Sequence, residues 1–256
     1  MSDHILVSTN DGIAEIRLNR PDKYNAITLA MYQAMADALV ASDEDPAVRA
    51  VLIVANGETF SAGNDLNDFV ANPPAGDDAP VFRFLRAIST ARKVVVAAVQ
   101  GSAVGVGTTM LLHCDLVIAA QSAKLQVPFV SLGLVPEAAS TLLLPRLIGY
   151  QRAAEFVLLG EPINAETAHR YGMVNRVVAD PQLYDTTRSL ALAVAARPPE
   201  AVRQTKALLR SAPNTVAERI AQEGAVFRAR LGSPELKEAV AAFFEKRAPN
   251  FANLPM

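Results

Sequence analysis

The sequence predicts an α/β fold with crossover connections between its strands, followed by a helical C-terminal region. Two observations lead to this class. Short runs rich in branched residues alternate with stretches of helical periodicity as far as residue 119, an order that favours a sheet covered by helices over a β-sandwich or a helix bundle. From about Pro181 onward the strand-like runs disappear. Four helices are expected there, at residues 183–196, 199–211, 215–231 and 234–247.

The first expected elements are a hairpin and a helix. Two strands are predicted at residues 5–9 and 13–18, because the Asn10-Asp11-Gly12 sequence between them is typical of a tight turn. Thr28 is the expected N-cap of a helix that ends near Pro46, since apolar residues recur between them at the spacing of one helix face.

Strands and helices alternate in the next segment. Strands are expected at residues 50–55, 94–99 and 116–119, and a helix is expected at residues 81–92. The polar segment 67–80, rich in proline and glycine, is predicted to be a mobile surface loop. Because it follows the first glycine-containing turn directly, a lid over a binding site is one role for it.

The composition excludes several classes of function. Half of the residues are apolar (51%) and 20% are charged, which indicates a globular protein. A net charge of −2 without a basic stripe argues against nucleic-acid and anionic membrane partners. The single Cys114 excludes an intrachain disulfide, and no group of Cys and His has the spacing of a zinc site. Without a signal sequence or a run long enough to span a bilayer, the expected compartment is the cytoplasm.

Two glycine-containing turns follow predicted buried strands. The first is FSAGNDL from Phe60 to Leu66, and the second is VQGSAVGVG from Val99 to Gly107. Each turn can leave a backbone amide unpaired, and two such amides aimed at one oxygen would form an oxyanion hole. Turn chemistry alone leaves two alternatives open, a tight connection without function and a phosphate-binding loop, although the glycine spacing is not that of a dinucleotide site.

The order and spacing of the motifs resemble the crotonase (enoyl-CoA hydratase/isomerase) superfamily over nearly the whole chain. The matching segments are LNRP from Leu18, FSAGNDL from Phe60, GSAVGVG from Gly101, HCD from His113 and FFEKR from Phe243. The resemblance implies a spiral of ββα units over residues 1–195 that binds an acyl-CoA thioester. It also implies a helical region over residues 196–256 that makes the contacts of a homotrimer or a dimer of trimers. It implies no metal and no redox cofactor. Coenzyme A enters only as part of the thioester substrate.

The resemblance also assigns roles to single positions. It implies that the backbone amides of Ala62 and Val106 form the oxyanion hole. The residues expected along the CoA ester are Lys23, Ser61, Asp65, Leu66, Phe84, Thr109, Phe129, Leu132 and Lys246. Lys23, and Lys246 from a neighbouring subunit, would contact CoA phosphates, and the alternative for both lysines is a solvated surface charge.

The candidate base is Glu137. Hydratases of the superfamily use two glutamates, whereas this sequence has Thr109 and Phe129 at the corresponding positions, and neither side chain can transfer a proton. Glu137 in LVPEAAS resembles the single catalytic glutamate of Δ3,Δ2-enoyl-CoA isomerases, and its apolar sequence neighbours are expected to raise its pKa. Spacing alone leaves an alternative, a structural carboxylate in the first turn of a helix that opens at Pro136.

The resemblance therefore implies an isomerase that moves a double bond from Δ3 to Δ2 of an acyl-CoA by a single-glutamate proton shuttle. Two alternatives stay open: an enoyl-CoA hydratase and a non-catalytic acyl-CoA-binding protein. His113 adjoins Cys114, but the apolar surroundings in the sequence predict core packing for this histidine.

Overall fold

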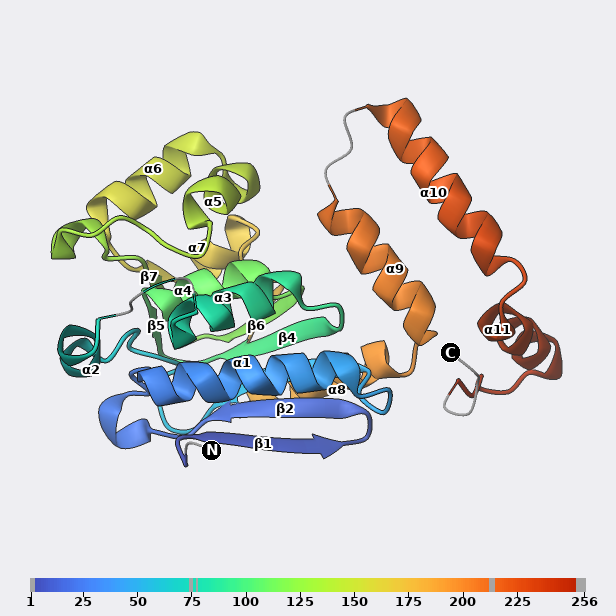
Figure 1. Cartoon of the computed structure of the whole chain (residues 1–256), viewed down its shortest axis with the longest axis horizontal. Helices are drawn as coiled ribbons and strands as arrows, with labels where there is room; N and C mark the ends of the chain where they lie inside the picture. Colours follow the sequence, from blue (N-terminus) through green and yellow to red (C-terminus); the bar gives the residue numbers. More distant parts are fainter. Residues whose placement is uncertain (1–2, 74–75, 77, 212–214, 252–256) are drawn as a thin grey trace. The chain divides into compact units, whose positions relative to one another are not determined.

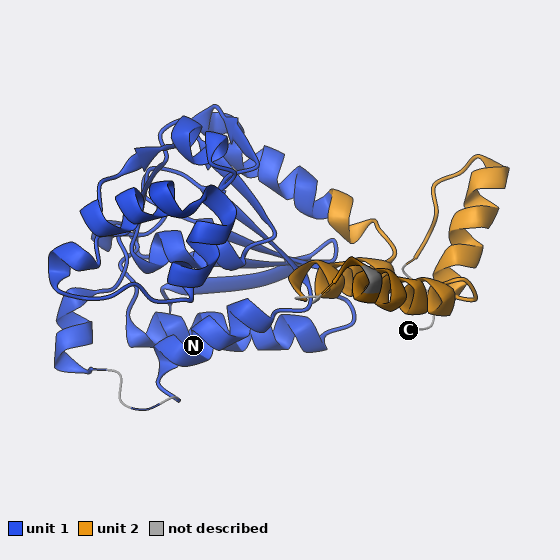
Figure 2. Ribbon diagram, turned by 90° about the horizontal axis from the view of Figure 1, so that it is seen from above, with its two compact units in different colours: residues 1–192 blue, residues 193–256 orange. Residues whose placement is uncertain are grey.

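The computed structural model describes residues 3–73, 76, 78–211 and 215–251 and confirms the predicted α/β class (Figure 1). The chain divides into two compact units, Met1–Leu192 and Ala193–Met256, which Figure 2 colours separately. Both sheets belong to the first unit, and helices make up the described part of the second. The second unit contains α9 (Pro199–Arg210), α10 (Val216–Arg230) and α11 (Pro234–Glu245), in agreement with the predicted helices.

The larger sheet has six strands in the order β1-β2-β3-β4-β6-β9. Its strands are β1 (Ile5–Asn10), β2 (Ile13–Leu18), β3 (Ala50–Ala55), β4 (Val94–Val99), β6 (Leu116–Ala120) and β9 (Arg176–Val178). The first two form the predicted antiparallel hairpin, and all other pairs are parallel. Every residue of β3 and β4 is buried, as expected for parallel strands covered on both faces.

Helices cover both faces of this sheet. Helix α1 (Leu29–Glu44) begins after Thr28, whose side chain accepts a hydrogen bond from the Met31 amide at 3.3 Å. Helix α3 (Pro80–Thr90) packs against α1 on the same face, whereas α8 (Leu183–Ala195) begins on the opposite face (Figures 1 and 2). The buried apolar cluster joins residues of α1 and α3 to alternate residues of β3 and β4.

A smaller sheet was not predicted. It joins β5 (Ser102–Val104), β7 (Lys124–Gln126) and β8 (Ile163–Asn164). Strands of two or three residues are too short to show an alternating pattern, which is why the sequence does not reveal them. The remaining elements are η1 (Pro21–Lys23), α4 (Val106–Thr109), η2 (Met110–His113), η3 (Val130–Leu132), α5 (Ser140–Ile148), α6 (Tyr150–Leu159), α7 (Ala165–Arg170) and η4 (Asp180–Gln182).

The prediction of a loop at residues 67–80 is wrong at its beginning, where the chain forms the short helix α2 (Leu66–Ala71). Asp65 accepts hydrogen bonds from the amides of Asn67 and Asp68 at 3.1 and 3.2 Å, a helix cap that was not predicted. Residues 74, 75 and 77 of the expected loop lie outside the described residues. No helix in the described part of the chain is both long and apolar enough to cross a membrane.

Candidate active site

The two glycine-containing turns lie against each other. The Ser61 amide donates to the Ser102 carbonyl at 3.0 Å, and the Val104 amide donates back to the Ser61 carbonyl at 2.9 Å. Glycine is required where the turns are closest: a Cβ on Gly63 would lie 2.8 Å from the Val104 carbonyl oxygen, and Gly63 has a φ of +89°. The bridge between residues 61 and 103 therefore brings two strand-to-helix connections together, as the sequence analysis anticipated.

The amide of Ala62, expected in the oxyanion hole, is already engaged. It donates to the Tyr24 carbonyl at 2.9 Å, so this part of the prediction is wrong. The neighbouring residues are bridged to Ile27, whose amide donates to the Gly63 carbonyl at 2.7 Å and whose carbonyl accepts from the Asp65 amide at 2.9 Å. Because amides alternate in direction along an extended segment, the amide of Asn64 points away from Ile27.

Two amides remain available where the turns meet. None of the described residues accepts a hydrogen bond from the backbone N–H of Asn64 or of Val106. Val106 is the first residue of α4, directly after Gly105 with a φ of +56°, so its amide is one of the unpaired donors at a helix start. The pair Asn64 and Val106 can therefore form the oxyanion hole. The period-two alternation after Ser61 is the signal that would have identified Asn64.

Glu137 lies beside α4. Its Oε1 accepts a hydrogen bond of 2.6 Å from the hydroxyl of Thr109, a fully buried residue. Thr109 follows Val106 by three residues in α4, so the carboxylate is hydrogen-bonded to the same short helix that begins with the available amide. Burial raises the pKa of Glu137, and the hydrogen bond from Thr109 lowers it by a smaller amount.

The environment that buries Glu137 is not the one expected. Its sequence neighbours Leu134 and Val135 are 50% and 81% exposed, so they do not surround the carboxylate. The carboxylate contacts Thr109 on α4, a segment far away in sequence. Burial by the folded chain therefore raises the pKa of Glu137, and Leu134 and Val135 contribute little to that burial.

The backbone at Glu137 also differs from the helix start that was considered as an alternative. Helix α5 begins only at Ser140, whose amide and hydroxyl donate to the Glu137 carbonyl at 3.0 and 2.6 Å. Ala138 and Ala139 have φ values of +56° and +53°, a left-handed conformation that costs about 1 kcal/mol or more for each alanine. His113, predicted to be a core residue, lies 2.9 Å from the Ala138 carbonyl through its Nε2 and thereby supports this segment.

Tyr32 joins the site from α1. Its hydroxyl donates to Oδ1 of Asn64 at 2.5 Å. Burial raises the pKa of Tyr32 well above its ordinary value, and the negative charge of Glu137 raises it further. The phenol, the Asn64 amide group and the Glu137 carboxylate therefore form one electrostatic cluster. The helical periodicity of α1 places Tyr32 on its buried face and gave no indication of this role.

Several other predicted residues support the site without reaching its centre. The Ser61 hydroxyl donates to the Asn25 carbonyl at 2.9 Å and accepts from the Gly63 amide at 3.1 Å, which fixes the first turn. Asp65 caps α2 and forms a salt bridge of 2.6 Å with Arg20, and this pairing lowers the pKa of Asp65. Phe84 is fully buried with its ring 5.5 Å from that of Tyr32.

The remaining predicted contacts lie around the edge or outside the cluster. Phe129 is buried, and its ring tip lies 3.9 Å from the position of a Cβ on Gly105. The side chains of Lys23, Leu66 and Leu132 are exposed, and their contact with a CoA ester stays a prediction. Lys246 belongs to the second unit, at the C-terminal end of α11, and its contact with a neighbouring subunit's ligand is equally untested.

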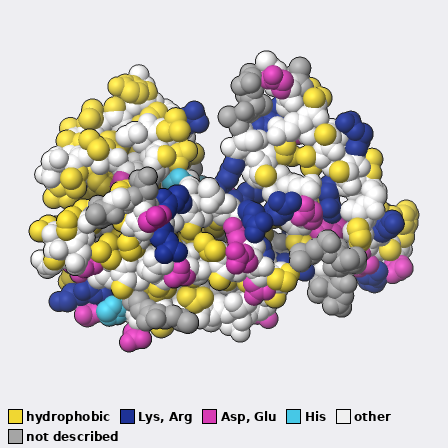
Figure 3. Space-filling view, in the orientation of Figure 1, with side chains coloured by type: hydrophobic (Ala, Val, Ile, Leu, Met, Phe, Trp, Pro, Cys, Tyr) yellow, Lys and Arg dark blue, Asp and Glu magenta, His cyan; other side chains and the backbone are white. Residues whose placement is uncertain are grey.

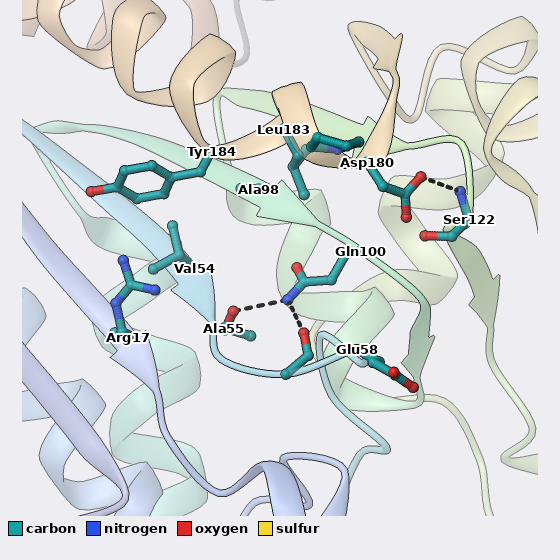
Figure 4. Close-up of a pocket in the computed structure, with 12 residues that line it drawn as sticks. Arg17, Val54, Ala55, Glu58, Ala98, Gln100, Ser122, Asp180, Leu183 and Tyr184 are labelled. Atoms are coloured by element: carbon teal, nitrogen blue, oxygen red, sulfur yellow. Dashed lines mark hydrogen bonds between the residues drawn. The ribbon is translucent and has the colours of Figure 1, made fainter.

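A separate pocket of about 740 Å³ lies in the first unit (Figure 4). It is lined by Arg17, Val54, Ala55, Gly57, Glu58, Ala98, Gln100, Ser122, Asp180, Pro181, Leu183 and Tyr184. Several polar groups in its wall already have protein partners. The Gln100 side chain donates to the carbonyls of Ala55 and Gly57, and Asp180 accepts from the Ser122 amide. None of the residues described around Glu137 lines this pocket.

Comparison with known proteins gives one consistent family. The family described as enoyl-CoA hydratase/isomerase matches residues 8–254. A 1,2-epoxyphenylacetyl-CoA isomerase from Escherichia coli strain K12 is 38% identical over 98% of this chain and 99% of its own. A crotonyl-CoA hydratase from Syntrophomonas wolfei is 33% identical over 97% and 98% of the two chains. The crystal structure of an enoyl-CoA hydratase/isomerase from Pseudoalteromonas atlantica T6c, 44% identical, matches with a TM-score of 0.79 over 97% of this chain and 100% of its own.

Proposed function

The chain belongs to the enoyl-CoA hydratase/isomerase family, and on this basis we propose that it moves the double bond of an acyl-CoA from Δ3 to Δ2. The observation that carries the proposal is a half-buried carboxylate, Glu137, hydrogen-bonded through Thr109 to the short helix α4, whose first residue, Val106, has an available amide. A carboxylate with a raised pKa is a stronger base than an exposed one, and it can also return the proton that it removes.

The proposed reaction uses one base and two amides. The Glu137 carboxylate removes a proton from C2 of a 3-enoyl-CoA, and the electrons of that C–H bond form a dienolate whose negative charge lies on the thioester oxygen. The amides of Asn64 and Val106 donate to this oxygen, each contributing about 3 kcal/mol to the transition state. The protonated Glu137 then delivers the proton to C4, which leaves the double bond between C2 and C3. The step needs no metal and no redox cofactor, and coenzyme A takes part only as the substrate's thioester.

Hydration of a 2-enoyl-CoA is the second candidate function, and the similarity to a protein named crotonyl-CoA hydratase favours it. Hydration requires one group that activates water and one that delivers a proton to C2. The residues at the two positions where the resemblance implies glutamates are Thr109 and Phe129, which cannot exchange protons at neutral pH. Glu137 alone would have to perform both tasks, and for this reason we favour the isomerase.

The test mixes 3-hexenoyl-CoA with the protein and follows the absorbance of the conjugated 2-enoyl product. Glu137→Gln should lower the rate by about 10²- to 10⁴-fold, because it removes the base and keeps the shape of the side chain. The control Glu155→Gln changes an exposed glutamate on α6 and should leave the rate unchanged.

Two other results would redirect the assignment. Rapid loss of conjugated absorbance from crotonyl-CoA, with no conversion of 3-hexenoyl-CoA, would identify a hydratase. Binding of both esters without turnover, and without any effect of Glu137→Gln, would identify an acyl-CoA-binding protein.

We also infer that the second unit supplies subunit contacts, in a homotrimer or a dimer of trimers. Its helices expose large apolar side chains, among them Phe227, Phe243 and Phe244, of which Phe243 is 78% exposed. Apolar side chains also gather over α5 and α6 of the first unit (Figure 3). Exposed apolar surface of this kind marks interaction sites. Sedimentation of wild type and of Phe243→Ser would test the inference, since the substitution should shift the mass toward the monomer.

A further inference from the structure

One stretch of chain, formed by α4 and η2, contacts the connection that carries Glu137 at two points. The Thr109 hydroxyl donates to Oε1 of Glu137 at 2.6 Å, and Nε2 of His113 lies 2.9 Å from the Ala138 carbonyl oxygen. The first contact is with the side chain of the candidate base, and the second is with the backbone that directly follows it. The same stretch begins with Val106, whose amide is available to the thioester oxygen.

The contact made by His113 has a defined direction. A carbonyl oxygen only accepts hydrogen bonds, so the hydrogen at this contact is on Nε2 of the imidazole, in the neutral ring as well as in the charged one. His113 is buried, so a side chain without a donor at this position would leave the Ala138 carbonyl facing an apolar group. The imidazole therefore does more than fill space in the core.

The backbone that His113 contacts needs such support. Ala138 and Ala139 have φ values of +56° and +53°, in a region that alanine rarely occupies. Residues keep this conformation only where the surrounding structure holds them in it. Ser140 holds one side of the turn, because its amide and hydroxyl donate to the Glu137 carbonyl. His113 holds the next carbonyl from outside the connection, and so ties the turn to the segment that starts the oxyanion hole.

We infer that His113 is a positioning residue, which aims the Glu137 carboxylate by holding the Ala138 backbone. The contact with Thr109 alone fixes how far the carboxylate lies from α4, but leaves it free to swing about that one point. A second attachment, on the backbone, fixes its direction as well. Direction matters because a displacement of about 1 Å between reacting groups can lower a rate about 10²-fold. The inference rests on the proposed function for the role of Glu137, and it adds the group that aims this base.

The first test compares His113→Leu with His113→Gln in the isomerisation of 3-hexenoyl-CoA. Leucine removes the donor, whereas glutamine places an N–H group at a similar reach from the backbone. We expect His113→Leu to lower kcat about 10²-fold and to change KM less than about threefold, because the imidazole acts on the base and does not touch the ester. His113→Gln should recover kcat to within about tenfold of wild type. The matched control is His169→Leu on α7, which removes the same kind of contact, 2.8 Å between Nδ1 and the Val174 carbonyl, and should leave the rate unchanged.

The second test does not depend on turnover. Glutamate carboxylates are labelled with ¹³C, the signal of Glu137 is assigned by its absence in Glu137→Gln, and its titration is followed by NMR. Burial raises the pKa of Glu137 by more than the hydrogen bond from Thr109 lowers it, so a carboxylate released into water should titrate closer to its ordinary 4.5. The titration should therefore move to lower pH in His113→Leu and stay in place in His113→Gln and His169→Leu. Tyr32, the other titratable group of the cluster, keeps its proton over this range because burial raises its pKa.

Several results would overturn the inference. Among them are a kcat that His113→Leu leaves unchanged, a loss of kcat that His113→Gln shares in full, and a Glu137 titration that does not move in His113→Leu. Circular dichroism would establish that the variants are folded, and His113→Phe, which keeps a ring and lacks the donor, replaces the leucine variant if that one is unfolded. Failure of the wild type to convert 3-hexenoyl-CoA would instead overturn the proposed function, and the NMR comparison would still decide the role of His113.

Discussion

Replacing Thr109 by valine should shift the pH dependence of the reaction in a direction that the structure specifies. Valine matches the shape of threonine and removes the hydroxyl that donates to Glu137 Oε1 at 2.6 Å. This hydrogen bond lowers the pKa of Glu137 against the larger effect of burial, so its loss raises the pKa further. A hydrogen bond to a charged group contributes about 1.5–3 kcal/mol, and one pKa unit corresponds to about 1.4 kcal/mol. We therefore expect the acid limb of the pH profile to move to higher pH, and activity at a given pH on that limb to fall about tenfold or more.

The assay is the pH profile of kcat/KM for conversion of 3-hexenoyl-CoA to its conjugated isomer. Because the base acts in its ionised form, activity falls as the pH drops through the pKa of Glu137. In Thr109→Val this fall should begin at higher pH, while the plateau above it is preserved. The neighbouring Thr108→Val is the matched control, since Thr108 is equally buried and donates to the Ala103 carbonyl. A profile that does not move in Thr109→Val, or that moves to lower pH, would refute the reasoning.

Three further predictions concern stability, each measured as the melting temperature Tm. The pKa of Glu137 in the folded protein is raised above its ordinary 4.5, so the ionised group destabilises the fold as the pH rises above that value. Glu137→Gln should therefore have a higher Tm than wild type at about pH 8 and the same Tm at about pH 4. Gly63→Ala should lower the free energy of unfolding by more than the roughly 1–2 kcal/mol of the left-handed conformation alone, because its Cβ would lie 2.8 Å from the Val104 carbonyl oxygen. Gly172→Ala, at a φ of +80° with open space around it, should lower it by only about that amount. For Asp65, whose pKa is lowered, the advantage of wild type over Asp65→Asn should be complete above the ordinary value of 3.8 and disappear as the pH falls below it. Equal costs for the two glycines, or pH-independent differences for the two acids, would contradict these expectations.

The parts of the fold that were predictable are those with long, regular sequence patterns. The strand at residues 50–55 and the strand at residues 94–99 have the expected bounds, because continuous branched residues mark buried parallel strands. The second sheet was missed since none of its strands exceeds three residues. Helix α2 was missed because its start depends on one capping carboxylate, Asp65, inside a segment rich in helix-breaking residues.

The sequence motifs predicted which segments form the candidate site, but they did not predict which backbone amides are available in it. The position of Glu137 came from a resemblance between sequences, and so did the amide of Val106. The choice between Ala62 and Asn64 depends on which way each amide points, which is set by the hydrogen bonds to Tyr24 and Ile27. Residues nearly forty positions away in sequence form those bonds, and no local pattern contains this information.

The left-handed pair of alanines after Glu137 has a consequence for how this scaffold can change its chemistry. The amides of Asn64 and Val106 belong to turns that are hydrogen-bonded to each other next to β5. Glu137 belongs instead to an irregular connection that ends where α5 begins, at Ser140. One residue gained or lost between Gly133 and Ser140 would move the Glu137 carboxylate relative to the two available amides, because this segment belongs to neither sheet. If the proposed proton transfer holds, a change in this one connecting segment would alter which carbon of the substrate is protonated, while both sheets keep their structure.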